Sequence, residues 1–315
     1  MVDQVILQKY FEEKILRPKT IQSYRQTMHK LTTSMRSVCN VHCVKQITRE
    51  TLLAWRAHEL HNGLTAISWN SYCRHLSTLF TFAIKQGLVQ WPENHFNTLQ
   101  LRTPKKMKKT LSDEKIIKIQ QELDALVRDE NMGRYNGRLH PVWFWRIVFE
   151  TLYYTGMRRN QLLHVRLRDV NLIDGTIFVR IEGSKGHNEN IIPIPHALLD
   201  SLSLLVRRAK QRCVGGNDQL FNVTCFGKNR YTYNVMRDAN ISNAFRELSE
   251  RVKFPASPHR LRHTLGTQLM RQPGKNLHLV KAILGHSDVR TTLEYVEPDI
   301  GDMRDLMNSM PNLAK

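Results

Sequence analysis

A ten-residue basic stretch at positions 101–110, LRTPKKMKKT, constrains the fold more than any other feature of the chain. It holds five Lys or Arg residues and one proline, a composition typical of an exposed, extended connector rather than of a packed element. A chain of 315 residues is also long enough for two hydrophobic cores. We therefore predict two domains, residues 1–100 and 111–315, joined by this basic linker.

The first hundred residues predict a bundle of helices. Apolar residues recur at helical spacing in the segment that starts at Thr20, at Ile21, Tyr24, Met28 and Leu31. Thr65 has the side chain of a helix N-cap, and a second apolar stripe follows it at alternating steps of four and three. This second stripe predicts a buried helix face, formed by Trp69, Cys73, Leu76, Phe80 and Ala83. The bundle is predicted to end near Gly87 and the pair Trp91-Pro92.

The second part predicts a mixed fold, mainly helical with a small antiparallel sheet. Ser112 with the two acids that follow is typical of a helix start, and the apolar segment 141–156 predicts a buried helix. Residues 174–195 predict two strands around a turn. The remainder is predicted to be mainly helical, in segments 243–252, 259–270, 276–285 and 290–296. Residues 128–140 predict an exposed loop.

The charge of the chain indicates its partner. Lys and Arg number 47 against 28 Asp and Glu, a net charge of +19. Such a surplus repels itself unless a polyanion neutralises it, either nucleic acid or an acidic membrane surface. No apolar run is long enough to span a membrane, and no basic amphipathic helix with an aromatic face stands out, so nucleic acid is favoured. The linker is either solvated or a strap along DNA phosphates, and we favour a strap that uses Lys105, Lys106, Lys108 and Lys109.

The five cysteines are odd in number and scattered, which argues against a disulfide framework and for a reducing cytoplasm. Cys39, His42 and Cys43 lie close together in the sequence, but a second cluster with zinc spacing is missing. We therefore expect ordinary thiols and no metal site.

Four short stretches hold the residues that suit chemistry. They are TGMRRNQLL (155–163), GSKGHNENIIPIP (183–195), HRLRHTLGT (259–267) and LGHSDVRTTLEYV (284–296). Each one alone has an ordinary explanation, as a surface charge, an exposed hairpin lysine, a polar helix face or a half-buried helical tyrosine. Taken in order, they supply two arginines, a lysine, two histidines and a tyrosine, which together suit phosphoryl transfer without a metal ion.

Each of these side chains fits one task in breaking a phosphodiester. Negative charge grows on the non-bridging oxygens, and the guanidinium groups of Arg158 and Arg262 fit those oxygens in pairs of hydrogen bonds. The leaving 5′-oxygen needs a proton, for which Lys185 and His259 are the candidates. The phenol of Tyr295, with a reference pKa near ~10, becomes a nucleophile only beside cations or a base.

The four stretches, in this order and at these separations, resemble the tyrosine recombinases, a family that includes phage integrases and Xer-type resolving enzymes. The family motifs are a TG-x-R helix end, a Lys in a β-turn, H-x-x-R-H followed by a Thr, and LGH with a Tyr in the next helix. This sequence matches them with Arg158, Lys185, His259, Arg262, His286 and Tyr295. The resemblance covers most of the chain, and it implies a helical core-binding (SAM-like) domain for DNA followed by a mixed α+β catalytic domain.

The resemblance also implies a mechanism for integration, excision or resolution of DNA elements. Tyr295 would attack the scissile phosphate to give a 3′-phosphotyrosyl link and a free 5′-hydroxyl, which needs neither ATP nor a divalent ion. Arg158, Arg262 and His286 would bind the phosphate, Lys185 would be the general acid, and His259 would assist proton transfer.

The implied partners are double-stranded DNA sites and further copies of the chain, since exchange between two duplexes needs four active sites. The four copies would form a homotetramer on DNA, joined by directionality factors or accessory DNA-bending proteins. The protein would act in the cytoplasm, at the nucleoid and away from membranes. A C-terminal helix would pack on its own domain or dock into a neighbour, and its apolar residues are Ile300, Met303, Leu306, Met307 and Met310.

Three positions depart from the family pattern. Gln161 stands where a Glu is most frequent, which would loosen the support of Arg158. The turn after Lys185 lacks the additional Lys and Arg residues that are common there, and Glu297 stands where a His is frequent. No reacting group is lost.

Three other functions compete with site-specific recombination. A type IB topoisomerase or a telomere-resolving enzyme uses the same chemistry, and relaxation of supercoils without strand exchange would distinguish the topoisomerase. A non-catalytic DNA-binding relative would keep the fold, but the intact set of six residues argues against it. A basic protein of membrane surfaces ranks last.

Overall fold

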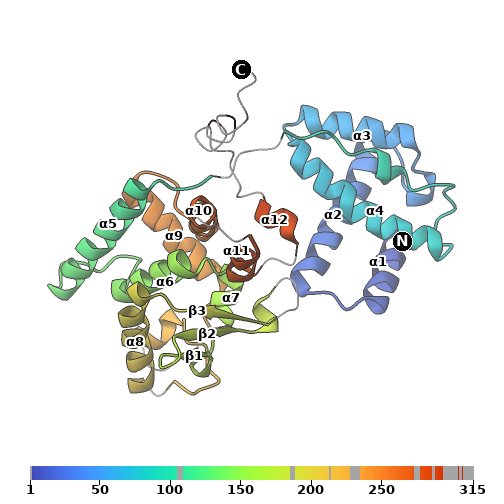
Figure 1. The fold of residues 1–315 in the computed structure, drawn as a ribbon. Coiled ribbons are helices and arrows are strands. Elements are labelled where there is room, and N and C mark those ends of the chain that lie inside the picture. Colours follow the sequence, from blue (N-terminus) through green and yellow to red (C-terminus); the bar gives the residue numbers. More distant parts are fainter. Residues whose placement is uncertain are drawn as a thin grey trace, which may run out of the picture. The chain divides into compact units, whose positions relative to one another are not determined.

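The chain forms two compact units in the computed structural model, Met1–Lys106 and Met107–Lys315, each with its own hydrophobic core (Figure 1). The structure describes residues 2–104, 109–184, 189–212, 214–227, 235–272, 277–285 and 288–293, together with Arg304 and Met307. Three of the four linker lysines, Lys105, Lys106 and Lys108, lie outside these residues, whereas Lys109 is described and exposed.

The first unit is a helical bundle, as the sequence predicts. Its helices are α1 (Val2–Glu13), α2 (Pro18–Cys39), α3 (Arg49–His61) and α4 (Ala66–Lys85), with short 3-10 helices at Val44–Gln46 and His95–Thr98. Thr65 caps α4, because its side chain accepts a hydrogen bond from the Ser68 backbone N–H at 3.2 Å. The predicted stripe of α4 is buried at all five positions, which confirms it as core.

The bundle continues beyond the end that the sequence predicts at Trp91-Pro92. Trp91 stacks on Phe80 with 4.6 Å between ring centroids, and Phe96 and Leu99 are fully buried. The indole of Trp69 donates to the Leu99 carbonyl at 2.9 Å. Aromatic contacts of this kind add to apolar burial. Helix α4 ends at Lys85, before the proline, but the core continues beyond it.

A buried carboxylate links two helices of the first unit. Glu59 of α3 accepts hydrogen bonds from Ser34 of α2 at 3.0 Å, from Trp55 at 3.1 Å and from the Lys30 ammonium at 2.9 Å. Burial raises the pKa of Glu59, but the three hydrogen bonds outweigh burial, and the net pKa lies below its usual value. The charged form is therefore the one that stabilises the bundle.

We expect Glu59→Gln to lower the free energy of unfolding by about 1–2 kcal/mol near neutral pH, because hydrogen bonds to a charged acceptor are stronger than those to an amide. This difference is present above the unfolded pKa of glutamate, 4.5, and disappears as the pH falls through the lower folded pKa. Urea unfolding of the full chain from neutral to acidic pH, with hydrogen exchange of the α3 amides, measures it.

The matched control is Glu93→Gln, which removes the same charge at an exposed position of the same unit. It should leave the free energy of unfolding unchanged across the pH range. A deficit in the Glu59→Gln protein that persists undiminished in acid would contradict a role for the charge.

The second unit is mainly helical with one small sheet, which confirms the predicted fold class. Its helices are α5 (Asp113–Asn131), α6 (Val142–Thr155), α7 (Arg159–His164), α8 (His196–Gln211), α9 (Asp238–Val252), α10 (Pro258–Arg271), α11 (Leu277–Leu284) and α12 (Val289–Leu293). Its strands are β1 (Val170–Asn171), β2 (Thr176–Val179) and β3 (Asn190–Pro193), in antiparallel order β1-β2-β3 with Val179 opposite Asn190. Short 3-10 helices lie at Leu167–Asp169, Ile181–Gly183 and Val223–Phe226.

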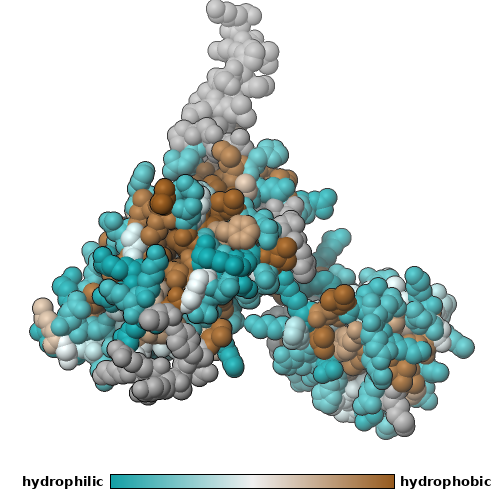
Figure 2. Space-filling model, turned by 90° about the horizontal axis from the view of Figure 1, so that it is seen from below, coloured by the Kyte–Doolittle hydropathy of each residue, from teal (hydrophilic) through white to brown (hydrophobic). Residues whose placement is uncertain are grey.

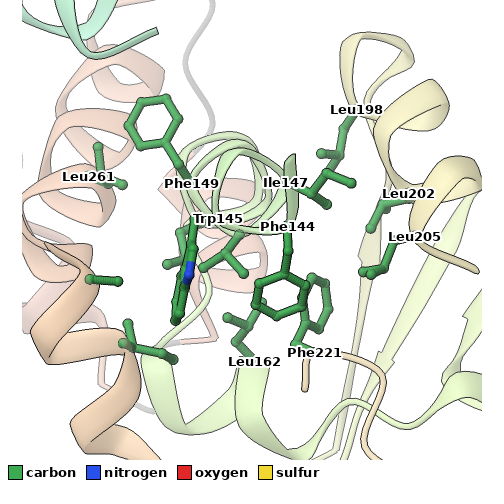
Figure 3. Packing of buried hydrophobic residues seen from close by; sticks show 14 of the residues in the cluster. Phe144, Trp145, Ile147, Phe149, Leu162, Leu198, Leu202, Leu205, Phe221 and Leu261 are labelled. Carbon is green, nitrogen blue, oxygen red and sulfur yellow. The ribbon is translucent and has the colours of Figure 1, made fainter. Parts of the chain in front are cut away.

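Helix α6 forms the centre of this core. Its side chains Phe144, Trp145, Ile147 and Phe149 are buried on several sides of the helix. Figure 3 shows Leu261 of α10 on one side of α6 and the leucines of α8 on the other. A helix that is apolar around most of its circumference is buried, as the sequence predicts for residues 141–156. The end of α6 is thereby fixed inside the unit.

Only part of the segment 128–140 is the exposed loop that the sequence predicts. Its first residues complete α5, and Leu139 is buried. The Glu130 carboxylate accepts a hydrogen bond from the backbone N–H of Val142, at 3.0 and 2.9 Å from its two oxygens. An acid that binds an N–H group at a helix start satisfies an otherwise unpaired donor and opposes the helix dipole. The segment therefore anchors the start of α6.

The described residues include neither a candidate membrane span nor a candidate metal-binding cluster. Hydrophilic side chains cover much of the face in Figure 2, with apolar residues exposed between them. No helix of the described part is long and apolar enough to cross a membrane. Within the same part of the chain, no group of three His, Cys, Asp or Glu residues is arranged to hold a metal ion. Burial raises the pKa of Cys73 to about 11, so that thiol is unreactive.

Candidate active site

The first element of the site is the turn that ends α6. Gly156 has φ +61°, a left-handed conformation that favours glycine, and its N–H donates to the Leu152 carbonyl at 3.1 Å. A Cβ at this position would lie 2.8 Å from Leu265 Cδ2 of α10 and 3.0 Å from Leu284 Cδ2 of α11. The glycine therefore allows three helices to meet. The turn directs the chain into Arg158, which precedes α7.

Arg262 of α10 joins the same three helices. Only 4% of its surface is exposed, and its guanidinium donates to the Gly156 carbonyl at 2.7 Å and to the Leu284 carbonyl at 2.5 Å. A buried charge needs partners, and these carbonyls supply two. Arg262 is therefore both a structural link and a cation fixed in place.

Arg158 reaches the adjacent carbonyl. Its Nη1 donates to the Gly285 carbonyl at 3.2 Å, while its backbone N–H donates to Gln161 Oε1 at 2.7 Å. The last carbonyls of a helix lack partners within the helix and carry the negative end of its dipole, so cations bind there. The structure thus brings Arg158 and Arg262 together at the carboxyl end of α11, directly before His286.

Gln161 keeps one of the tasks that the family glutamate would have. It is buried, and its oxygen holds the backbone of Arg158, so the turn is supported despite the substitution. Its neutral amide supplies no negative charge. The Gln161 nitrogen also lies 3.9 Å from where a Cβ of Gly285 would stand.

His259 lies exposed in the first turn of α10, whereas Arg262 is buried. The Nε2 atom of His259 is 2.8 Å from Nε2 of the buried His263, one turn further along the helix. A hydrogen bond between two ring nitrogens requires a proton on one and a lone pair on the other. His263 belongs to the H-x-x-R-H motif, but nothing in the sequence assigned it a role. In the structure its ring lies in hydrogen-bond contact with that of His259.

The hairpin that carries Lys185 is fixed to α7 at its base. Asn160 Nδ2 donates to the carbonyls of Glu182 at 3.2 Å and Gly183 at 3.1 Å. A Cβ at Gly183 would lie 2.9 Å from the Gln161 Cα, so only glycine allows this close approach. The segment that follows β2 is therefore set relative to α7, the helix that follows Arg158.

An ion pair between the partly buried Arg180 and the buried Asp169 also supports this hairpin. Arg180, directly after β2, donates from Nε to Asp169 Oδ2 at 2.7 Å and from Nη2 to Asp169 Oδ1 at 2.5 Å. The paired geometry fixes the direction in which the chain leaves β2. The hydrogen bonds to Asp169 raise the pKa of Arg180, so the guanidinium stays charged.

Three of the six predicted catalytic residues, Lys185, His286 and Tyr295, lie outside the described residues. Their described neighbours are Ser184, Gly285 and Leu293. The sequence did not identify three residues that hold the site together, which are Asn160, Gly183 and Asn190. Their partners are backbone groups distant in the sequence, and such contacts leave no periodic pattern. The only local signal is that all three lie within the stretches that hold Arg158 and Lys185.

Comparison with known protein families shows which family the chain belongs to. The model of the phage integrase family matches residues 140–300, and that of the phage integrase N-terminal SAM-like domain matches residues 7–87. The chain belongs to the phage integrase family. Both matches agree with the resemblance that the motifs indicate.

Two relatives within the family bear the name putative tyrosine recombinase XerC. The protein of Pseudomonas syringae is 36% identical over 96% of this chain, and the chain spans 63% of that relative's length. The protein of Pseudomonas aeruginosa is 34% identical over 98% of the chain and 72% of the relative.

Solved structures of family members share the fold. The Tn1549 transposon integrase in complex with circular intermediate DNA aligns with 97% of this chain and 98% of that chain, with a TM-score of 0.73 and 18% identity. A lambda integrase tetramer bound to a Holliday junction aligns with 94% of this chain and 76% of that chain, with a TM-score of 0.66 and 17% identity. These likenesses confirm the predicted fold of a tyrosine recombinase.

Proposed function

We propose that the chain is a site-specific DNA recombinase that cleaves and rejoins DNA through a 3′-phosphotyrosyl intermediate. The observation that carries the proposal is the meeting of Arg158 and Arg262 at the Leu284 and Gly285 carbonyls, directly before His286. Two fixed guanidinium groups beside one helix end suit a phosphate whose charge increases during the reaction. Family membership and the names of the relatives support the same activity.

The six motif residues divide the reaction between them. Tyr295 Oη gives its proton to His259 or to solvent and bonds to phosphorus, while the bond from phosphorus to the 5′-oxygen breaks. Lys185 gives a proton to that oxygen, and His259, oriented by His263, assists the transfer. Arg158 and Arg262, with His286, bind the phosphate and stabilise the transition state. The covalent link conserves the energy of the phosphodiester, so the 5′-hydroxyl of another strand reverses the step without ATP or a metal ion.

The two parts of the chain have separate tasks in this proposal. Residues 1–100 form the core-binding domain, the linker 101–110 follows DNA phosphates through its lysines, and residues 111–315 form the catalytic domain. Four copies act together on double-stranded DNA, a proposal supported by the lambda integrase tetramer on a Holliday junction. We propose that the protein acts in the cytoplasm, at the nucleoid, because its proposed substrate is DNA, and that directionality or DNA-bending proteins join it there.

A trapping experiment tests the proposal. Nicked duplexes from the neighbourhood of the gene release a short 5′-hydroxyl fragment after cleavage, so the covalent intermediate accumulates. In EDTA and without ATP, we expect a detergent-stable adduct on the 3′ side of the break. Trypsin would release the DNA on the peptide between Arg290 and Arg304, whose single tyrosine is Tyr295. A requirement for a divalent ion, or a link to a 5′-phosphate, would contradict the proposed chemistry.

A further inference from the structure

Asn190 connects the hairpin of Lys185 to the helix end that holds the two arginines. It is the first residue of β3, and its Nδ2 donates to the Ala282 carbonyl of α11 at 3.0 Å. The same nitrogen lies 3.6 Å from where a Cβ of Gly285 would stand, and Arg158 Nη1 lies 3.9 Å from that point. Gly285 is thus surrounded by side chains from β3 and from the start of α7.

The two strands of the hairpin are held by different helices. Asn160 binds the β2 side to α7 through the carbonyls of Glu182 and Gly183, and Asn190 binds the β3 side to α11. Both helices contribute to the phosphate site, α7 next to Arg158 and α11 through the carbonyls of Leu284 and Gly285. The two asparagines therefore fix both ends of the turn that contains Lys185 relative to the site where phosphate is proposed to bind.

The contact of Asn190 is not needed to keep α11 folded. The Ala282 carbonyl also accepts a hydrogen bond from the Gly285 N–H at 3.0 Å, so it keeps a partner when the asparagine is removed. Asn190 is only partly buried, and the register of β3 against β2 depends on backbone bonds. Its loss should free the hairpin from α11 without unfolding either.

We propose that Asn190 is a positioning residue for proton transfer to the leaving group. The inference rests on the proposed function and deepens it: Asn190 acts through the turn of Lys185, which it holds at the carboxyl end of α11. In the cleavage step the Tyr295 oxygen bonds to phosphorus as the 5′-oxygen leaves. Lys185 Nζ supplies the proton that the leaving 5′-oxygen takes. Because proton donation depends on short distances, a hairpin freed from α11 slows this step more than any other.

Two substrates that differ in one atom separate this role from a general structural one. The variants Asn190→Ala and Asn190→Asp both lack the donor, and Asp keeps the shape of Asn. Single-turnover adduct formation is measured on nicked DNA with a 5′-bridging oxygen and on the same DNA with a 5′-bridging sulfur. A thiolate leaves without a proton, since a thiol has a pKa of only about 8.5.

We expect both variants to lose about 10–100-fold in the rate of adduct formation with the bridging oxygen. This loss is a part of the ~10²–10⁴-fold rate enhancement that general acids supply. With the bridging sulfur they should stay within about 3-fold of the unchanged chain. Asn171→Ala is the matched control, because it removes an asparagine that donates to Asp174 at 2.6 Å in the same sheet. It should change neither rate. Equal losses on both substrates, or no loss on either, would overturn the proposal.

Hydrogen exchange without DNA gives a second readout that is independent of catalysis. We expect Asn190→Ala to raise exchange in residues 189–193 and 277–285 together, while α8 stays unchanged. If the unchanged chain forms no adduct on any DNA, the proposed function fails. Exchange then still decides whether Asn190 couples the hairpin to α11, and unaltered exchange in both segments would overturn the coupling.

Discussion

The Tyr295→Phe protein is expected to form no covalent adduct with nicked DNA while binding that DNA as tightly as the unchanged chain. Phenylalanine lacks the oxygen that would bond to phosphorus, so no other group of the site replaces it. DNA affinity comes mainly from contacts between basic side chains and phosphates, which the substitution leaves in place. Adduct formation in detergent gels and binding by filter retention measure the two quantities on the same DNA.

Tyr153→Phe is the matched control for this experiment. Tyr153 is half-buried in α6 and stacks on Phe149, so loss of its hydroxyl should leave adduct formation unchanged. Burial raises the pKa of the neighbouring Tyr154, which makes that phenol a poorer nucleophile. Adducts that persist in the Tyr295→Phe protein would contradict the assignment, and Tyr231 and Tyr233 would then be the next tyrosines to replace.

Arg262→Ala is expected to have the second largest effect, on both stability and cleavage. It leaves the buried carbonyls of Gly156 and Leu284 without their guanidinium donors. Each unsatisfied group lowers the free energy of unfolding by about 1–3 kcal/mol. Loss of one preorganised donor from a transition state commonly costs about 10²–10³-fold in rate. Urea unfolding gives the first quantity, and single-turnover adduct formation at saturating protein gives the second.

Arg262→Lys separates the two effects, because it keeps the charge but not the planar fork. A lysine ammonium is a single point of charge and does not satisfy two carbonyls and a phosphate together. We expect the lysine protein to recover part of the lost stability and little of the lost rate. Arg128→Ala, which removes the same charge from the exposed end of α5, should change neither. Normal cleavage in the Arg262→Lys protein would contradict a role for the guanidinium geometry.

Local pattern was sufficient to predict most of the elements. The stripe from Trp69 to Ala83 repeats at helical spacing and is buried as predicted, because a helix places residues three and four apart on one face. Residues 174–195 were predicted to form two strands around a turn, and β2 and β3 lie within this segment. Where a proline or a polar run interrupts a pattern, as after Gly87 and in 128–140, prediction from sequence ended the packed structure too early.

The motifs alone determined the family and the set of groups available for phosphoryl transfer, because the residue type itself identifies a reactive side chain. They did not determine how those groups are held. Only the tertiary structure showed that Arg158, Arg262 and Asn190 all bind carbonyls at the carboxyl end of α11. Backbone carbonyls are present at every residue, so the sequence does not show which of them lack partners. That depends on where a helix ends and on which distant segments reach it.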